Sequence, residues 1–551
     1  MLAKQTTLQE IIEGTRQYIV PLFQRTYSWK KKQWEVLWED LIELSEIDTP
    51  HAHFMGSIVS VQIDSSPEGM LKFLLIDGQQ RLTTIFIVLA LLRNKLEEQG
   101  SGDFADEIND LLINRHKQGD DHYKLIPTQE DNITYQNLIN NKLGKEKNLL
   151  TDAYRFFEKQ LKETNYDFHK LKRIITNYLS IVSIVLDRND NPYLVFESLN
   201  AKGQPLTQAD LVRNHLFMQI EKAEQQEIYR KYWNPMQDAL VDEKKDNLTE
   251  FIRRFLTMKE GNTVGKDNVY FTLKEKVKGG NKDTIEYIKE LYRYSFFYRK
   301  IKNPAFEEEP TLQRCLSKLS RIEVTVAYPL ILSFYNDYDK HRISKDDFSS
   351  LLLIIENYVI RRLLCNYPKH KLYKVFPTIY TKIQDKYSNN MIEGLKKTLQ
   401  NEGYPKNAEF TSWFHKIKIY KSSSNSTNKF ILEAIEQSYN HKESISFEKL
   451  TVEHIMPQTL TYKWKEDLGE NWEEIYDQYL DTIGNLTLTG YNSELSNGGF
   501  SEKKKKLNES NLEMNKYFTQ HQIERWGESE IKARAEILAT KALEIWPYLG
   551  D

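Results

Sequence analysis

Cysteine is almost absent from this chain. Only Cys315 and Cys365 occur among its 551 residues. Two thiols cannot build a disulfide framework or a cysteine-rich zinc site, and the scarcity of cysteine fits the reducing interior of a cell. We therefore expect a cytoplasmic protein.

Long hydrophobic runs are absent as well. The longest strongly apolar stretch, residues 85–92, lies between Arg81 and Arg93. It is too short to span a bilayer, which takes about 20 apolar residues. The first ten residues also lack the apolar core of a secretory signal. We therefore expect no association with a membrane, and we interpret residues 85–92 as part of a buried helix.

The chain has no excess of charge of either sign. It holds 76 lysines and arginines against 79 aspartates and glutamates, which gives a formal net charge of -3. No global basic excess points to nucleic acid, so any contact with DNA requires local basic patches. The run Lys503–Lys506 predicts a basic helix start that faces either the DNA backbone or only solvent.

The sequence does contain enough apolar surface for a folded protein of several domains. Hydrophobic residues make up 40% of the chain and aromatic residues 12%, which argues against disorder. A chain of 551 residues is too long for one core, so we expect two or three domains. The patterning predicts an α+β fold that is predominantly helical, with a hairpin of strands at 53–62 and 71–76 and long helices over 220–400.

The C-terminal part holds the residue types that a one-metal nuclease needs. Thr-Val-Glu-His-Ile-Met-Pro at 451–457 predicts a strand that ends in an acid and a histidine. Ile-Gly-Asn-Leu-Thr-Leu at 483–488 predicts a second strand. His454 could act as the general base near neutral pH. A histidine beside a strand can also be purely structural, and this alternative stays open.

The same set offers oxygen ligands for a divalent cation. Glu453 and the side-chain carbonyl of Asn492 would suffice for Mg²⁺ or Mn²⁺, because such an ion keeps several waters. Asn485 could accept a hydrogen bond from the second ring nitrogen of His454 and orient the ring. The predicted catalytic residues are therefore His454 and Asn485, and the predicted metal ligands are Glu453 and Asn492.

A phosphate-binding turn is predicted near residue 78. A strand at 71–76, the sequence Asp-Gly-Gln-Gln-Arg at 77–81 and a helix to about residue 98 follow one another. This order places free backbone N–H groups and the positive end of a helix dipole at one point. Asp77 could cap the helix or hold a cation, and Arg81 offers a charged fork for phosphate oxygens. An ordinary capped turn would also explain these residues.

Gln24 and Arg25 are candidates for the same pocket. They follow an extended stretch around Pro21, because proline disfavours helix in the residue before it. The alternative is that the neighbouring aromatic residues, Tyr27 and Trp29, only pack against the next helix.

A later segment could return to that pocket. Asn200 begins a predicted turn, and Thr207 is expected to cap a helix with Asp210 as the acid of a capping box. Arg213 and Asn214 follow one turn later. A solvated helix face would explain the same pattern.

Together these motifs resemble the GmrSD-like type IV restriction enzymes and their SspE-like relatives. Asp-Gly-Gln-Gln-Arg-Leu-Thr-Thr at 77–84 and Gln-Arg-x-Tyr-Ser-Trp at 24–29 are similar to N-terminal motifs of that family. Glu-His-Ile-x-Pro-Gln at 453–458 is similar to its C-terminal HNH (ββα-metal) motif. The resemblance covers about residues 5–225 and 400–530.

The chain departs from compact HNH motifs in three ways. A long insert separates His454 from Asn485, and Asn492 stands where many such proteins have histidine. The zinc-binding cysteine pairs of some HNH proteins are missing. The insert leaves the register of the second strand open.

The resemblance implies three parts. Residues 1–225 would form a nucleotide-binding sensor domain with a ParB/sulfiredoxin-like fold, residues 226–400 a helical spacer, and residues 401–551 an HNH nuclease domain. The first domain would bind and hydrolyse a nucleoside triphosphate (GTP, ATP or UTP). Its implied nucleotide-binding residues are Gln24, Arg25, Asp77, Gly78, Gln79, Gln80, Arg81, Asn200, Asp210, Arg213 and Asn214.

The resemblance and the residue chemistry together predict a nucleotide-regulated, modification-dependent DNA endonuclease of type IV restriction, acting against phage in the cytoplasm of a bacterium or archaeon. One alternative is a triphosphate-hydrolysing DNA sensor or blocker with a weak or silent nuclease site. Another alternative is a helical protein that only binds partners. In that case the similarity of both the N-terminal and the C-terminal motifs to the family would have to be a coincidence. The expected partners are DNA, in particular modified phage DNA, and a nucleotide, with a homodimer as a further option.

Overall fold

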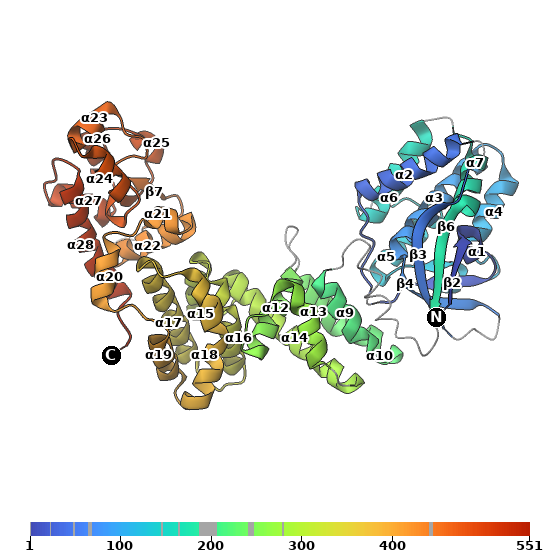
Figure 1. The fold of residues 1–551 in the computed structure, drawn as a ribbon, viewed down its shortest axis with the longest axis horizontal. Helices are drawn as coiled ribbons and strands as arrows, with labels where there is room; N and C mark the ends of the chain where they lie inside the picture. Colours follow the sequence, from blue (N-terminus) through green and yellow to red (C-terminus); the bar gives the residue numbers. More distant parts are fainter. Residues whose placement is uncertain are drawn as a thin grey trace. The chain divides into compact units, whose positions relative to one another are not determined.

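The computed structural model describes most of the chain: residues 2–22, 24–47, 50–63, 69–144, 147–163, 166–186, 207–240, 247–277, 280–439 and 445–550. Helices make up 66% of the structure, beside a mixed N-terminal sheet, which confirms the predicted α+β, predominantly helical fold. The chain divides into two compact units, Met1–Pro235 with Tyr270–Ile288, and Met236–Val269 with Lys289–Asp551 (Figure 1). The predicted division into three functional parts stays a prediction.

The first unit is built on a six-stranded mixed sheet, in which the strands are ordered β1-β6-β3-β4-β2-β5. Strands β3 and β4 pair antiparallel, which confirms the predicted hairpin. Strand β6 lies antiparallel to β1 and parallel to β3, and β2 lies parallel to both β4 and β5. The strands are β1 Leu2–Thr7, β2 Arg16–Ile19, β3 His53–Gln62, β4 Leu71–Asp77, β5 Leu125–Ile126 and β6 Leu179–Leu186.

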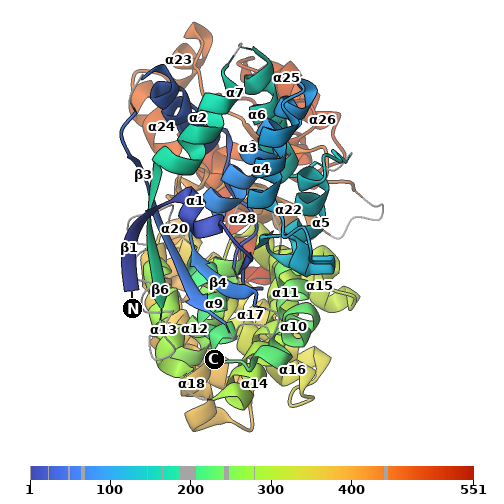
Figure 2. The ribbon, with the colours of Figure 1, turned by 90° about the vertical axis from the view of Figure 1, so that its right-hand side faces the viewer.

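Helix α3 (Gln79–Glu98) is the centre of the first unit's core. All its residues from 82 to 94 are buried, which confirms the buried helix predicted over 85–92. Helices α4, α5, α6 and α7 pack against it (Figure 2). The helices of this unit are α1 Leu8–Ile12, α2 Lys31–Glu46, α3, α4 Gly102–Leu112, α5 Gln129–Ile139, α6 Leu149–Glu163, α7 Phe168–Arg173, α9 Gln208–Met218, α10 Lys222–Ile228, α13 Val269–Lys276 and the first part of α14 Asn281–Lys302. The unit also contains the short 3-10 helix η1 Gly119–His122 and the π-helical segments η2 Ile174–Tyr178 and η3 Tyr229–Trp233.

The second unit consists of helices and one two-stranded sheet, made of β7 Thr451–His454 and β8 Leu486–Thr489. Among the described residues, no helix combines the length and the apolar composition that a membrane crossing requires. The remaining elements are α11 Asn234–Ala239, α12 Asn247–Glu260, η4 Lys266–Asn268, the rest of α14, η5 Pro304–Phe306, α15 Pro310–Arg321, η6 Thr325–Ala327, α16 Tyr328–Asp339, α17 Lys345–Leu364, η7 Lys369–Lys371, α18 Leu372–Tyr387, α19 Met391–Asn401, α20 Asn407–Phe414, α21 Ile419–Ser422, α22 Asn425–Gln437, α23 Tyr462–Leu468, α24 Trp472–Tyr479, η8 Ile483–Asn485, α25 Asn492–Leu495, α26 Phe500–Asn508, α27 Glu513–Gln520 and α28 Glu528–Ile545.

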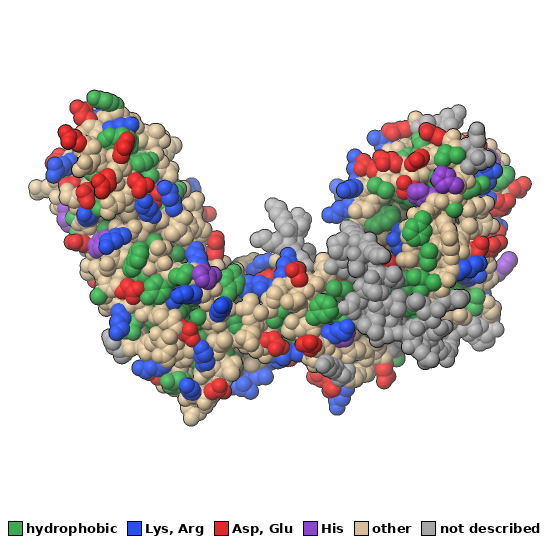
Figure 3. Space-filling model, viewed as in Figure 1, with side chains coloured by type: hydrophobic (Ala, Val, Ile, Leu, Met, Phe, Trp, Pro, Cys, Tyr) green, Lys and Arg blue, Asp and Glu red, His purple; other side chains and the backbone are tan. Residues whose placement is uncertain are grey.

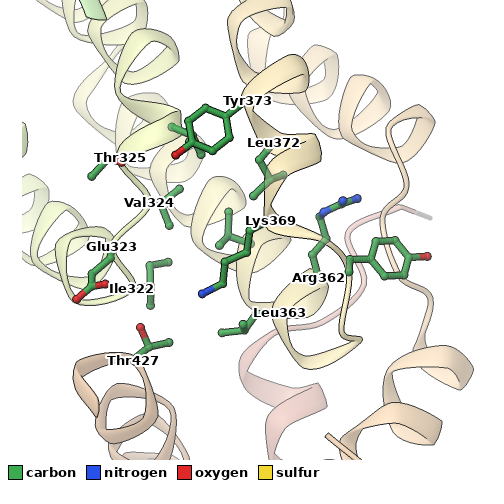
Figure 4. A pocket seen from close by; sticks show the side chains of 13 residues that line it. Ile322, Glu323, Val324, Thr325, Arg362, Leu363, Lys369, Leu372, Tyr373 and Thr427 are labelled. Carbon is green, nitrogen blue, oxygen red and sulfur yellow. The ribbon is translucent and has the colours of Figure 1, made fainter. Parts of the chain in front are cut away.

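A small cavity of about 140 Å³ lies among the helices of the second unit. Val324, Leu363, Leu372 and Tyr373 are among its lining residues (Figure 4). The apolar part of this lining is typical of helix packing, and none of the residues singled out by the sequence lines the cavity.

Arg361 of α17 anchors the end of the chain that follows α28. Its side chain is completely buried. Nη1 donates to the backbone oxygen of Trp546 at 2.6 Å, and Nε donates to that of Pro405 at 3.0 Å. Nη2 donates to Oδ1 of Asn407 at 3.0 Å, and the guanidinium lies over the ring of Phe410. One buried cation therefore joins three segments that are distant in the sequence.

Replacing Arg361 with methionine should loosen this junction. Methionine keeps much of the apolar volume but leaves three oxygen acceptors without a donor, at a cost of about 2–4 kcal/mol. Hydrogen exchange at the amides of α17 and α28 measures this loss, because it reports the free energy of local opening. Arg525→Met removes an arginine whose side chain is 81% exposed, and it serves as the matched control. Unchanged protection in Arg361→Met would contradict the anchoring role.

Candidate active site

Of the two predicted catalytic residues, His454 ends strand β7, and Asn485 lies in η8, directly before strand β8. Strand β7 pairs antiparallel with β8, in a register that sets Glu453 opposite Thr487 and His454 opposite Leu486. The long insert between the strands forms α23 and α24, and α26 follows β8. The hairpin therefore places the end of β7 beside the start of β8, and this settles the register that the sequence left open.

The imidazole of His454 is buried and held by a carboxylate. Its Nε2 lies 3.2 Å from Oδ1 of Asp481, and its ring meets that of Tyr420 edge-on with centroids 4.5 Å apart. Nδ1 has no hydrogen-bond partner among the described residues. Burial lowers the pKa of His454 below 6.5, although Asp481 opposes this effect. The ring is therefore neutral at neutral pH and can accept a proton at Nδ1.

Asn485 does not make the contact with His454 that we expected. Its Oδ1 accepts from the backbone N–H of Met456 at 2.8 Å and from Nε1 of Trp526 at 2.9 Å. Its Nδ2 donates to the backbone oxygens of Met456 and Leu480, at 3.0 and 2.9 Å. All four hydrogen-bonding positions of the amide are thus used. Asn485 closes the loop after β7, and the predicted hydrogen bond to the ring is wrong.

The residue that the sequence reading missed is Asp481. Its side chain is 3% exposed, and its Oδ2 lies 3.0 Å from Nζ of Lys421. The backbone N–H of Tyr420 donates to its backbone oxygen at 3.2 Å. The sequence did contain one signal for this contact. Asp481 stands just before the Ile-Gly-Asn-Leu motif, and antiparallel pairing of the two strands brings the start of the second strand close to His454 at the end of the first.

Glu453 is bound by a lysine of α26. Nζ of Lys503 lies 2.6 Å from Oε1 of Glu453 and donates to the backbone oxygen of His454 at 2.8 Å. The Lys503 side chain is 1% exposed. We expected the run at 503–506 to face either DNA or solvent, and for Lys503 this is wrong because the helix turns it toward β7. Burial raises the pKa of Glu453 and lowers that of Lys503, and each opposes the shift of the other.

Asn492 begins the short helix α25 and lies over β7. Its Nδ2 donates to Oγ1 of Thr451 at 2.9 Å and to the backbone oxygen of Val452 at 3.2 Å. The amide nitrogen is therefore fixed against the strand that carries Glu453. Its Oδ1 has no hydrogen-bond partner among the described residues, so this carbonyl is available as a ligand.

Glu453 and Asn492 offer the types of donor atom that a hard cation binds. Among the described residues there is no group of three or more histidines, cysteines, aspartates or glutamates that could hold a metal ion. A carboxylate and an amide carbonyl are nevertheless the oxygen ligands that Mg²⁺ takes when water fills the rest of its shell. The ammonium of Lys503, held by a carboxylate and a carbonyl oxygen, shows that this place accepts positive charge.

Close packing of α28 fixes the start of β8. A Cβ on Gly484 would lie 2.5 Å from the backbone oxygen of Ile531, so only glycine fits. Arg534 is completely buried, and its Nη1 donates to the backbone oxygens of Gly484 and Leu486 at 2.8 and 2.7 Å. Burial lowers the pKa of Arg534 to about 10. A single cation thus holds the backbone on both sides of Asn485.

In the first unit, the predicted turn before α3 is tight. Gly78 is the N-cap residue, with φ 94°, and a Cβ there would lie 2.9 Å from Cγ1 of Ile58. Asp77 does not cap the helix: its Oδ2 lies 3.4 Å from Nη2 of Arg81. Arg81 also donates to the backbone oxygen of Ser57, and its guanidinium lies where a Cβ on Gly56 would be. The turn therefore joins β3 to α3 through the Arg81 side chain.

The glutamines of the turn bind the segment that follows β2. Nε2 of Gln79 donates to the backbone oxygen of Arg25 at 3.2 Å. Gln80 accepts from the N–H of Ser28 at 2.7 Å, and Gln24 donates to the backbone oxygen of Ile76 at 3.1 Å. These three amides have a structural use, because they fasten the segment that carries Arg25 to the start of α3.

Four of the predicted side chains form one charged group beside the start of α3: Arg25, Asp77, Asp210 and Arg213. Nη2 of Arg213 lies 2.7 Å from Oδ1 of Asp210, and Thr207 and Asp210 form the predicted capping box at the start of α9. Burial lowers the pKa of Arg25, while Asp210 and Asp77 raise it and Arg213 lowers it further. The Arg25 guanidinium has no hydrogen bond to another described residue. It is therefore the cation best placed to meet an anionic ligand.

Asn214 and Asn200 are the two remaining predicted nucleotide-binding residues. Asn214 is buried, and its Oδ1 has no hydrogen-bond partner among the described residues. Asn200 lies outside the described residues. Both stay predictions.

The surface shows no gathering of one kind of charge on the face drawn in Figure 3, where acidic and basic side chains of the described residues are interspersed over both units. On α26, Lys504 and Lys506 lie at 3.2 and 3.0 Å from Glu524 and Glu494. Any DNA contact by this helix therefore competes with ion pairs of its own.

Two family models match the chain. The model for the N-terminal domain of the GmrSD restriction endonuclease matches residues 8–217, and the model for the C-terminal domain of GmrSD restriction endonucleases matches residues 404–541. No curated protein sequence matches the chain. The first range includes the turn before α3 and the helix that carries Arg213, and the second includes β7, β8 and α26.

Both residue sets therefore lie within the matched ranges and follow in the order expected from the motifs. A restriction endonuclease acts on DNA, and its role is defence against phage. The chain belongs to the GmrSD-like type IV restriction endonuclease family.

Proposed function

We propose that this endonuclease cuts modified phage DNA at the β7–β8 hairpin with one divalent ion, under the control of a nucleoside triphosphate bound at the α3 turn. The observation that carries the nuclease part is the histidine at the end of β7, whose Nε2 is held by a buried carboxylate while its Nδ1 has no partner among the described residues. This is the arrangement that a general base requires.

His454 would act on a water molecule. With Nε2–H donated to Asp481, the lone pair of Nδ1 takes a proton from water as its oxygen attacks the phosphorus. Asp481 then stabilises the imidazolium that forms. The bond from phosphorus to the leaving oxygen breaks, and that oxygen is protonated from solvent. Asn485 contributes by holding the loop after β7, which fixes the direction of the ring.

Glu453 and Asn492 would hold the divalent ion, Mg²⁺ or Mn²⁺. Such an ion, when bound, supplies positive charge to the scissile phosphate. Oε1 of Glu453 already accepts from Lys503, so Oε2 and Oδ1 of Asn492 are the oxygens proposed as ligands. The hydrogen bonds from Lys503 to Glu453, and from Asn492 to β7, restrict the conformations of both side chains in the absence of an ion.

The nucleotide would bind with its phosphates at the start of α3. Backbone N–H groups of the first helical turn and the helix dipole favour an anion there. Of the charged side chains, Arg25, Arg81 and Arg213 outnumber Asp77 and Asp210 by one positive charge. GTP, ATP and UTP all carry the triphosphate that this group would meet. Hydrolysis at this place would be the signal that regulates cutting.

A second candidate function has one observation in its favour. The Glu453 carboxylate, the predicted metal ligand, is paired with Lys503 inside the structure. A triphosphate-hydrolysing DNA sensor or blocker with a silent nuclease site would show the same pair. Hydrolysis without any nicking of DNA would distinguish it.

His454→Ala should abolish cleavage of DNA in the presence of Mg²⁺. Loss of a general base costs on the order of 10²–10⁴ in rate. The measurement is nicking of phage DNA by purified protein, and His370→Ala, an exposed histidine of the same unit, is the control. Equal rates of cleavage by wild type and His454→Ala would contradict the assignment of His454 as the general base.

Asp481→Asn should slow cleavage while leaving the DNA-binding surface intact. The amide has nearly the same shape, but it stabilises the imidazolium poorly and favours the wrong tautomer, for an expected loss on the order of 10²–10⁴. Single-turnover cleavage rates measure the effect. Asp477→Asn changes an aspartate on α24 whose side chain is 81% exposed, and it should cut at the wild-type rate. A folded Asp481→Asn protein with an unchanged rate would show that the carboxylate is only structural.

Arg25→Ala should weaken nucleotide binding with little effect on folding. The Arg25 guanidinium has no hydrogen bond with a described residue to lose, whereas Arg81→Ala would also break the contacts with Ser57 and Asp77. A charge-assisted contact to phosphate is worth about 1.5–3 kcal/mol, so binding should weaken by about ten- to a hundredfold. Titration with each of the three triphosphates measures it, with the exposed Arg173→Ala as control. Equal affinity in Arg25→Ala and wild type would remove Arg25 from the pocket.

A further inference from the structure

We propose that Lys503 is a built-in counter-cation that keeps the affinity of Glu453 for a divalent metal ion low in the DNA-free protein. The inference rests on the proposed metal-dependent function of this site and names a residue that controls it. Lys503 is a positioning residue here, because it acts through Glu453.

The geometry gives Lys503 a fixed place. It lies one turn into α26, and Phe500 at the start of that helix is buried against Trp526 and Phe518. The ammonium makes two contacts, to Oε1 of Glu453 at 2.6 Å and to the backbone oxygen of His454 at 2.8 Å. With its side chain 1% exposed, it cannot turn out to solvent without moving the helix.

The charges at the site balance without any metal ion. Glu453 faces Lys503, and Asp481 faces Lys421 at 3.0 Å. Each of the two buried carboxylates thus already has an ammonium partner. A divalent cation that approaches Oε2 of Glu453 meets a like charge a few ångströms away, on the other oxygen of the same carboxylate. Repulsion at that distance is strong even at the effective dielectric of a protein.

The pair also shapes how the carboxylate can bind. Because Oε1 accepts from Lys503, Glu453 can offer only Oε2, so the ligand is monodentate. A single charged oxygen beside an ammonium is a weak site for a hard ion. Removing the ammonium should free both oxygens and the full negative charge.

The test is direct binding of Mn²⁺ to the DNA-free, full-length protein, followed by the electron paramagnetic resonance signal of the free ion. Lys503→Met should bind Mn²⁺ at least about tenfold more tightly than wild type, since a like charge next to the ligand is gone. Lys503→Gln keeps a hydrogen-bond donor in the same place and should show the same gain in Mn²⁺ affinity. It replaces the methionine variant in the test if that variant does not fold. Lys503→Arg retains the charge and should bind as weakly as wild type.

Two controls locate the effect. Lys505→Met removes an exposed lysine of the same helix and should leave Mn²⁺ binding unchanged. The double variant Glu453→Gln with Lys503→Gln should lose the gain, because the carboxylate itself is gone; replacing both partners of a buried pair also avoids an unpaired buried charge.

The outcomes separate this inference from the function on which it rests. If wild type, Lys503→Met and Lys503→Gln bind Mn²⁺ equally, the role of Lys503 is overturned while the metal site stands. If none of the variants binds Mn²⁺, the assignment of Glu453 as a metal ligand fails as well. A gain that survives in the double variant would place the ion elsewhere and would also overturn the inference.

Discussion

Buried charge is the constraint on which the second unit depends. An ion taken out of water is tolerated only when it finds a partner or several hydrogen bonds. Glu453 finds Lys503, and Asp481 finds Lys421 and the ring of His454. Because each pair joins β7 or the start of β8 to another element, satisfying the charges also assembles the site. The geometry of the candidate site and the stability of this region therefore have a common origin.

A continuous set of contacts links the helical part of the second unit to this site. Arg361 of α17 holds the backbone of Trp546, which directly follows α28. Helix α28 in turn carries Arg534, which holds the backbone of Gly484 and Leu486 on either side of Asn485. The elements are packed closely enough that a Cβ on Gly484 would collide with α28. The contacts therefore run without a break from α17 through α28 to the start of β8.

The motif residues of the first unit divide into two groups. The glutamines Gln24, Gln79 and Gln80 use their amides to fasten one loop to the start of α3, so their place in the motif has a structural reason. Arg25 differs, because its guanidinium is partly buried among charged groups and makes no hydrogen bond with a described residue. The glutamine contacts place that arginine where an anion would approach. A structural role for most of a motif is thus compatible with a ligand-binding role for one member.

The sequence by itself determined the class of fold, the hairpin of β3 and β4, the buried helix α3, the capping box at Thr207 and the two short strands of the second unit. The first of these strands carries Glu453, and Asn485 lies directly before the second. These features follow from local patterns, since periodicity, glycine and capping residues act over a few positions. Only the tertiary structure decided which polar groups meet. Asp481 replaces Asn485 as the partner of His454, and Lys503 turns inward to Glu453, because antiparallel pairing and helix packing bring together residues far apart in the chain. Spacing along a sequence does not by itself determine which charged groups meet, so the pairing of charges had to come from the fold.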